Sequence, residues 1–317
     1  MDRMSLKEKI YSKKTLLSFS VAFAILYLLL IKVDLARTLE IMKGVRLRIY
    51  LLAIVVFYTA FFLRGLRWSK LLENAGLTTP WRDATEILFV SWFANCLIPA
   101  KLGDVYRGYL LKKNYKHSLS KTMGTIFVER AFDIIAIVVL LLLTGFIAFK
   151  GGMPITILRS LKVVGALSIF LILILIFVVY QEGFISRFAP KTLREVIERF
   201  EEGISQSLRR RSLPIITVYT LVMWLSDALR LFLVTRAIDF PIPISLLIFV
   251  SFTGALLTAF PGTPAGLGAV ELAIAGLLIL MGVTKEVAVS IAILDRLITY
   301  WSLLIFTGTA HVLSSKT

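Results

Sequence analysis

Two short stretches of this chain are the most informative about its fold: residues 99–105 are PAKLGDV, and residues 264–270 are PAGLGAV. They agree at five of seven positions, at an offset of 165 residues. Both contain proline, which removes a backbone donor, and glycine, which permits backbone angles that helices do not use. Each stretch interrupts a longer apolar region, residues 83–114 and 244–282 respectively. The sequence therefore predicts two apolar segments that are broken in the middle.

The composition around these breaks is that of a membrane protein. Of 317 residues, 58% are hydrophobic and 18% are charged, whereas a soluble domain has about 45–50% apolar and about 25% charged residues. These values exclude a soluble enzyme, a disordered chain and a fibrous protein. The formal charge of +16 would suggest nucleic acid in a soluble protein. In so apolar a chain the expected partner is the anionic bilayer surface, and no nucleic acid is expected.

Six further segments are apolar enough to cross the hydrocarbon core, which takes about 20 helical residues. They are residues 15–31, 49–66, 122–149, 157–180, 213–236 and 287–312. A backbone break at membrane depth is tolerated only where it is buried in protein or lines a water-filled cavity. We therefore expect an all-α polytopic membrane protein with six full spans and two re-entrant helical hairpins, at residues 83–114 and 244–282.

The distribution of basic residues predicts the orientation in the membrane. Lysine and arginine gather on the cytoplasmic side, and they are dense in residues 1–14, 64–82, 101–121 and 181–212. Because 64–82 and 101–121 are both expected inside, the stretch between them must enter the membrane and return. Both termini are then cytoplasmic, and the chain is expected to be a multi-pass protein of the cell membrane. The first external loop, 32–48, is also basic, which runs against this rule.

A duplication would explain why the two breaks are alike. Further pairs lie at nearly the same offset: Glu129-Arg130 with Asp295-Arg296, and Arg67 with Arg230. We predict a single membrane domain, residues 1–317, with repeat 1 at about 15–149 and repeat 2 at about 157–312. The predicted topology makes the repeats antiparallel. Inverted repeats with broken helices near the midplane are typical of transporters, whose substrate sites lie at the repeat interface.

Four motifs together resemble a known family. They are Phe62 to Trp68, Asn95 to Arg107, Glu129-Arg130 with Asp133, and Pro261 to Gly268 with Glu271. They are similar to the flippase-like membrane region of the lysylphosphatidylglycerol synthase family, over nearly the whole chain, although Ala265 stands where a glycine is expected. The resemblance implies a role in moving a lipid. Members that synthesise aminoacylated lipid add a soluble aminoacyl-transfer domain, which is not expected in a chain that ends at Thr317.

Charged residues within apolar helices mark the expected site. Such a residue costs about 2.5–3.5 kcal/mol on insertion scales, so it should face a partner or a cavity. Glu129 and Asp133 share a helix face, and Lys101 and Arg107 are their expected partners, together with Arg296. The predicted lipid-headgroup site comprises Asn95, Lys101, Gly103, Asp104, Arg107, Glu129, Arg130, Asp133, Gly262, Gly266, Gly268, Glu271, Asp295 and Arg296. No metal or cofactor is expected, since Cys96 has no ligand cluster around it.

Several of these residues have structural interpretations as well. Asp104 is expected to cap the second arm of its hairpin, where the helix N-terminus and Arg107 also favour a phosphate diester. The pairs Glu129-Arg130 and Asp295-Arg296 are alternatively ion pairs that lock helices together. Glu271 is expected to contact the headgroup or to carry a proton. Three neighbouring residues, Arg64, Arg67 and Trp68, are expected to anchor a helix end at the membrane surface.

The sequence thus favours a lipid translocase over an enzyme. An anionic or phosphate-headed lipid would pass its headgroup between the two hairpin tips while its tails stay in the bilayer. One alternative is a membrane-embedded lipid-modifying transferase with Glu129, Asp104 or Glu271 as general base. Another is a scaffold subunit that does not transport. The sequence leaves open which lipid is moved, in which direction, with which driving ion, and whether the protein is a homo-oligomer.

Overall fold

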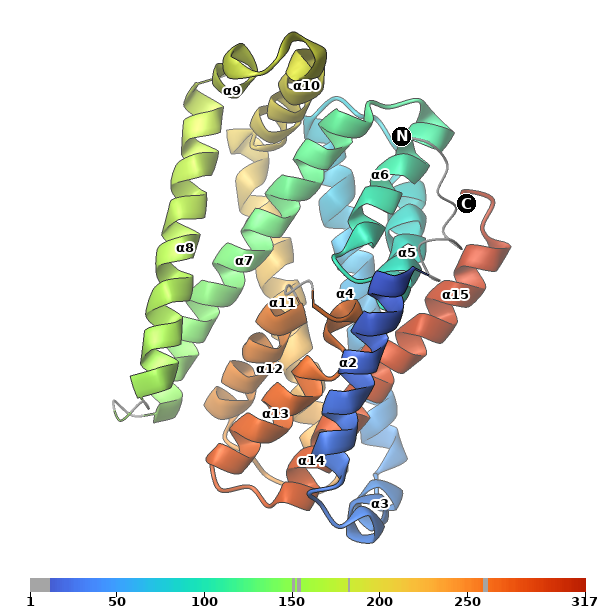
Figure 1. The fold of residues 1–317 in the computed structure, drawn as a ribbon, viewed down its shortest axis with the longest axis vertical. Helices are drawn as coiled ribbons and strands as arrows, with labels where there is room; N and C mark the ends of the chain where they lie inside the picture. The colour runs from blue at the N-terminus through green and yellow to red at the C-terminus, as the bar shows by residue number, and fades with distance from the viewer. Residues whose placement is uncertain (1–11, 150–151, 153–154, 182, 259–261) are drawn as a thin grey trace.

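The computed structural model describes residues 12–149, 152, 155–181, 183–258 and 262–317, and these residues form helices and loops without strands (Figure 1). Within this part of the chain six helices are long and apolar enough to cross a membrane. They are α2 (Lys13–Leu30), α4 (Leu47–Asn74), α7 (Leu119–Phe149), α8 (Ile155–Tyr180), α11 (Leu213–Ala237), and α14 (Lys285–Arg296) continued by η3 (Leu297–Ser302) and α15 (Leu303–Leu313). The six predicted spans are confirmed. The basic residues Arg3, Lys7 and Lys9 lie outside the described residues.

Each predicted break separates two short helices. The first pair is α5 (Trp81–Leu97) and α6 (Leu102–Tyr115); the second is α12 (Ile244–Thr258) and α13 (Ala269–Leu280). At about 1.5 Å per residue none of the four reaches the roughly 30 Å of a hydrocarbon core. Figure 1 shows the first pair in the upper half of the molecule and the second in the lower half, with both breaks near the middle. Between α12 and α13, the short helix η2 (Pro264–Gly266) packs against α5.

The two breaks begin with the same backbone conformation. The residue before each proline, Ile98 or Thr263, is extended, because a following proline disfavours the helical conformation. Two left-handed residues then follow each proline. In the first break these are Ala100 at φ 63° and Lys101 at φ 52°; in the second they are Ala265 at φ 44° and Gly266 at φ 72°. The sequence match is therefore also a match in conformation as far as Lys101 and Gly266. Beyond these residues the breaks differ, because Leu102 and Gly103 already belong to α6, whereas Gly268 has a positive φ of 83°.

The bundle is built on the long helices α4 and α11, which pack along one another, with α7, α5 and α12 around them. Helix α8 is different because much of its apolar surface is exposed: Leu167 and Phe170 are 62% and 61% exposed. In water an exposed apolar surface of this kind would favour aggregation, whereas in a membrane it is expected to face lipid. A surface helix, α10 (Lys191–Ser207), crosses one end of the bundle and packs on α7.

The crossing of α10 over α7 is made by two glycines. A Cβ on Gly203 would lie 2.2 Å from the Lys121 carbonyl oxygen, and one on Gly124 would lie 2.4 Å from the Phe200 carbonyl oxygen. Because backbone atoms cannot move aside easily, we expect Gly203→Ala to lower the free energy of unfolding by about 1–3 kcal/mol. The matched control is Gly165→Ala in α8, where a Cβ meets nothing within 4 Å. Unfolding of both variants in mixed detergent micelles checks this, and equal stability would contradict it.

Candidate functional site

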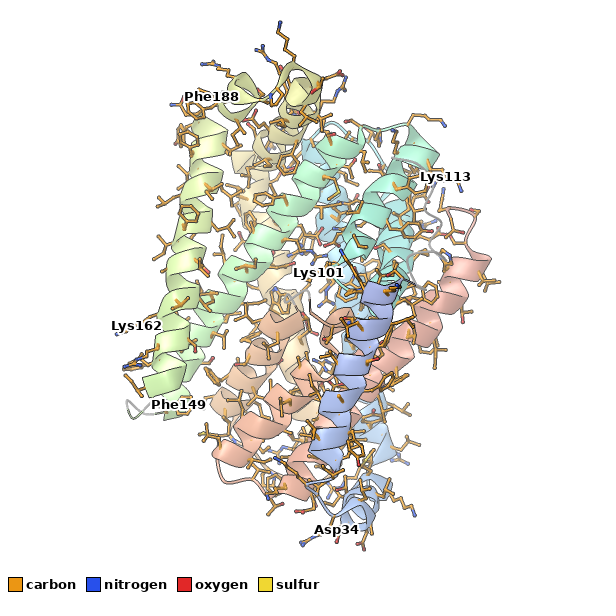
Figure 2. All side chains as sticks on the ribbon, viewed as in Figure 1. Asp34, Lys101, Lys113, Phe149, Lys162 and Phe188 are labelled. Atoms are coloured by element: carbon orange, nitrogen blue, oxygen red, sulfur yellow. The ribbon has the colours of Figure 1, made fainter. Side chains whose placement is uncertain are left out.

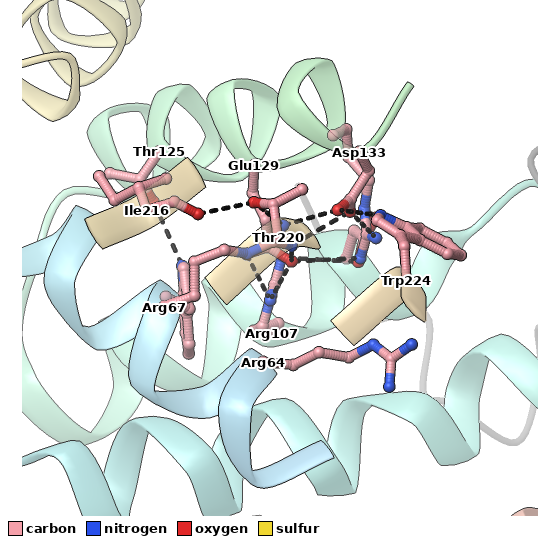
Figure 3. A network of polar contacts seen from close by, with 12 residues as sticks. Arg64, Arg67, Arg107, Thr125, Glu129, Asp133, Ile216, Thr220 and Trp224 are labelled. Carbon is pink, nitrogen blue, oxygen red and sulfur yellow. Dashed lines mark hydrogen bonds and ion pairs between the residues drawn. The ribbon is translucent and has the colours of Figure 1, made fainter. Parts of the chain in front are cut away.

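The first of two charged clusters lies between α4, α6 and α7 (Figure 3). It joins three arginines to three carboxylates: Arg67, Arg107 and Arg130 with Asp104, Glu129 and Asp133. Arg67 donates to both oxygens of Asp133, at 2.6 and 3.1 Å. Arg107 donates to Glu129 at 3.1 Å, and Arg130 donates to both oxygens of Asp104, at 2.9 and 2.8 Å. We call this group the first charge cluster.

The first charge cluster is buried and electrically balanced. Arg67 and Arg107 are 1% and 0% exposed, and the Arg107 guanidinium lies 4.4 Å from the centre of the fully buried Trp68 ring. Helix α11 completes the cluster, because Thr220 accepts from Arg67 at 2.9 Å and Trp224 donates to Asp133 at 3.2 Å. Since a buried charge is strongly unfavourable unless paired, the three ion pairs fix α4, α6 and α7 relative to one another, and the hydrogen bonds of Thr220 and Trp224 add α11.

The second charge cluster lies on α4, α11, α13 and α14. It contains Arg64, Arg230 and Arg296 with Asp227, Asp295 and Glu271. Arg64 donates to Asp227 at 2.7 Å, and Arg230 donates to Asp295. Arg296 donates to Glu271 and to the Ala265 carbonyl oxygen, both at 3.1 Å. This cluster also has equal numbers of positive and negative charges, and its Arg296 binds the backbone of the second break.

The two clusters share one plan. In each, an arginine on a long helix binds a carboxylate in the first turn of a short helix: Arg130 binds Asp104, and Arg296 binds Glu271. In each, the acidic residue just before that arginine pairs with an arginine of another long helix. Arg67 lies 3.4 Å from Glu129 in the first cluster, and Arg230 binds Asp295 in the second. A π-helical turn directly follows Arg296, at Leu297–Ser302, and such turns are frequent at functional sites.

A cavity of about 120 Å³ lies between the two clusters and the two breaks. This volume accommodates several water molecules or a compact polar group. Residues of both breaks line it, Ala100 and Lys101 from the first and Thr263 and Ala265 from the second. Its charged lining residues are Arg64, Lys101, Arg130, Arg230 and Arg296 against Asp227 and Asp295. Cationic groups therefore predominate on its walls.

The comparisons with known proteins identify the family. A model of the lysylphosphatidylglycerol synthase TM region matches residues 15–306. The chain belongs to this family. It is 36% identical over 214 residues to a UPF0104 membrane protein of Methanocaldococcus jannaschii, covering 68% of this chain and 91% of that protein. It is 25% identical to a UPF0104 membrane protein of Pyrococcus horikoshii, covering 91% and 93%. It is also 24% identical to the glycosyltransferase AglD of Haloferax volcanii, covering 77% of this chain but 45% of that protein.

The structure divides the predicted headgroup residues of this family member into three groups. Five line the cavity: Asn95, Lys101, Arg130, Asp295 and Arg296. Five carry charge in the clusters beside it: Asp104, Arg107, Glu129, Asp133 and Glu271. The four glycines shape the backbone of the breaks: Gly103, Gly262, Gly266 and Gly268. At Gly103 a Cβ would lie 2.4 Å from the Ser91 carbonyl oxygen, so the helices of the first pair need glycine there.

Some predicted contacts differ from those observed. Arg107 pairs with Glu129 as expected, but Lys101 pairs with no carboxylate among the described residues. Asp104 does not cap α6, because both of its oxygens bind Arg130. Glu271, which was expected to contact the headgroup or to carry a proton, accepts from the Gly268 N–H at 2.8 Å and from Arg296.

The prediction that Arg64, Arg67 and Trp68 anchor a helix end at the membrane surface is wrong. All three are buried in the bundle, at 9%, 1% and 0% exposed, and both arginines pair with acids of other helices. The sequence did contain a signal for Arg67: it matches Arg230 in the predicted second repeat, and both arginines pair with buried acids. Ser251 and Trp224 also line the cavity without having been predicted. Within the described ranges no three His, Cys, Asp or Glu side chains are placed to hold a metal ion.

Proposed function

We propose that this protein is a lipid translocase of the cell membrane. In this proposal the α5–α6 and α12–α13 pairs are re-entrant hairpins that enter the membrane from opposite faces as parts of an inverted repeat. The headgroup of a phosphate-bearing lipid passes through the cavity where the two breaks meet, while its tails stay in the bilayer. The observation that carries the proposal is a cavity, lined by both breaks, whose charged walls are mainly cationic.

The arrangement of the helix pairs supports the re-entrant topology. The free ends of α5 and α6 lie toward the end of the molecule where α10 lies, and those of α12 and α13 lie toward the opposite end (Figure 1). Helix α5 begins and α6 ends at the first of these ends, and the exposed basic residues there, Arg82, Lys112, Lys113 and Lys116, together with the basic segment 181–212, assign it to the cytoplasm. Both termini are proposed to be cytoplasmic. The matched backbone at the start of the two breaks and the similar ion pairs of the two clusters support the repeat.

The chemistry of the cavity suits a phosphate. Arginine presents a planar fork of donors that binds two oxygens of one phosphate group, and four of the five cationic lining residues are arginines. The space is too small for acyl chains but adequate for a headgroup. The name of AglD refers to glycosyl transfer by that protein, more than half of which lies outside the match. A headgroup that carries a sugar on its phosphate is compatible with the same site, and we propose transport without covalent chemistry.

Thiol labelling tests the topology. On a Cys96→Ser background, we expect Arg82→Cys and Lys112→Cys to react with an impermeant reagent only from the cytoplasmic side. Lys285→Cys should react only from the outside. All three positions are exposed and lie at the free ends of the helix pairs or beside them. Labelling of Arg82→Cys and Lys112→Cys from opposite sides would show that α5 and α6 together cross the membrane, and would contradict the re-entrant hairpin.

Reconstitution tests the translocase itself. In vesicles that contain a phosphatidylglycerol with a fluorescent tail, an impermeant quencher reaches only the outer leaflet. We expect quenching to stop at about half in protein-free vesicles and to proceed well beyond half when the protein is present, because lipid then moves between leaflets. Quenching that stops at the protein-free level, with correctly inserted protein, would contradict the proposal.

A further inference from the structure

We infer that the cavity selects a lipid headgroup that carries one net negative charge, a phosphate diester with no compensating amine, and that Lys101 determines this selectivity. The inference rests on the proposed function and names its substrate class. It distinguishes an anionic phospholipid from a zwitterionic one and from a cationic aminoacylated one.

The charges around the cavity leave one cation without a partner. The two clusters pair six arginines with six carboxylates. Lys101 lines the cavity but has no ion pair within the part of the chain that the structure describes. Figure 2 places it at mid-height, on the first break. The site therefore carries one uncompensated positive charge at a depth where an unpaired charge is unfavourable, and a bound monoanion neutralises it.

Several buried polar atoms around the cavity have no hydrogen-bond partner. Among the described lining residues, three buried polar atoms lack a hydrogen-bond partner: Arg64 Nη1, Arg230 Nε and Ser251 Oγ. Their side chains are at most 10% exposed. Buried donors of this kind are costly unless a ligand supplies acceptors. The oxygens of a phosphate diester are such acceptors, and an ammonium group on the headgroup would add further donors to a site that already has unpaired ones.

Lys101 has a strained backbone conformation. Lys101 adopts a left-handed conformation, at φ 52°, while the second break places glycine at the equivalent position, Gly266 at φ 72°. Glycine adopts this conformation without steric strain, and lysine does not. A residue held at a strained position where glycine would fit better points to a role for its side chain.

Thermal shifts with soluble short-chain lipids test the inference independently of transport. The probes are phosphatidylglycerol (net charge −1), phosphatidylethanolamine (0) and lysylphosphatidylglycerol (+1), added to the purified full chain in neutral detergent. We expect the anionic lipid to bind at least about tenfold more tightly than the others, and so to raise the melting temperature most; a tenfold preference is about 1.4 kcal/mol.

Substitutions at Lys101 separate its charge from its effect on folding. Lys101→Gly should keep or raise the melting temperature of the free protein, because glycine relieves the strained backbone. It should also lose the preference for the anionic lipid about tenfold or more. Lys101→Arg should retain the preference, and so should the control Lys112→Gln, an exposed lysine of α6. Equal binding of the three lipids, or an unchanged preference in Lys101→Gly, would overturn the inference.

Two further outcomes separate this inference from the proposed function. If inorganic phosphate alone gives the same Lys101-dependent shift, the anion site stands and its assignment to a lipid headgroup is overturned. If the protein moves all three lipids between leaflets at one rate, the translocase stands and the selectivity for an anion is overturned. A Lys101-dependent preference in binding, without movement of any lipid, supports the anionic site and overturns the translocase.

Discussion

Arg67→Met is expected to destabilise the fold by about 3–5 kcal/mol, because it leaves a buried carboxylate without its charge partner. Arg67 is 1% exposed and binds Asp133 through two hydrogen bonds, with Glu129 3.4 Å away and Thr220 accepting a third bond. Its loss turns the first charge cluster from a neutral group into one with a surplus negative charge. Unfolding in mixed micelles with a rising fraction of sodium dodecyl sulfate measures the change.

A surface arginine provides the matched control. Arg199 on α10 pairs with Glu195 one helical turn away, and both side chains are at least half exposed. Because such pairs contribute only about 0.3–0.5 kcal/mol, Arg199→Met should be close to neutral. If the two methionine variants were equally stable, the buried cluster would not hold the helices as described.

A compensating change shows whether charge balance is the cause. The double variant Arg67→Met with Asp133→Leu removes one charge of each sign, so the cluster is neutral again. We expect it to be more stable than Arg67→Met alone, by about 1 kcal/mol or more, which is within the usual coupling energy of residues in contact. Losses that simply add would instead attribute the effect of Arg67 to packing.

Gly254→Leu is expected to reduce lipid transport at least about tenfold, which is about 1.4 kcal/mol in the barrier. Gly254 lies on α12 and lines the cavity. A Cβ there would meet Val270 at 3.4 Å and Ile274 at 3.7 and 3.9 Å, which are ordinary contacts. The backbone therefore accepts a side chain at this position, and a leucine would occupy space that the headgroup needs. The quenching assay in vesicles measures the rate.

The control for this prediction is a second glycine of the same helix pair. Gly276 on α13 is exposed, and a Cβ there meets nothing within 4 Å. Gly276→Leu should therefore leave transport unchanged, and the melting temperature should be unchanged in both variants. Full activity in Gly254→Leu, with the folded protein reconstituted to the wild-type level, would show that the lipid does not pass through this cavity.

The positions of the helices and breaks could be predicted because they depend on local properties. A run of about 20 apolar residues is sufficient to indicate a span, and all six predicted spans are present. The breaks follow from Ile98-Pro99 and Thr263-Pro264, where proline forces the preceding residue out of the helical conformation. The pairing of Arg107 with Glu129 was also predicted, since a charged residue in an apolar helix needs a partner and few were available.

The roles of Arg64, Arg67 and Lys101 could not be predicted in the same way. Composition places charges in α4 but does not show which way they point, and a long side chain near a helix end can reach water by extending along the helix. Only the packing of α7 and α11 against α4 closes that route and brings Asp133 and Asp227 within reach. Conversely, Lys101 was expected to pair with the acids of α7, but Arg67 and Arg107 bind those acids instead.

The membrane class, the six spans, the two breaks and the residue types that gather near them all follow from the order of amino acids, because each depends on neighbours along the chain. Which arginine pairs with which carboxylate, and which cation is left over, follows from the packing of the helices. Within the two charge clusters those pairings join residues up to 163 positions apart, as with Arg64 and Asp227. In a balanced network, the unpaired charge becomes apparent only when every partner has been located.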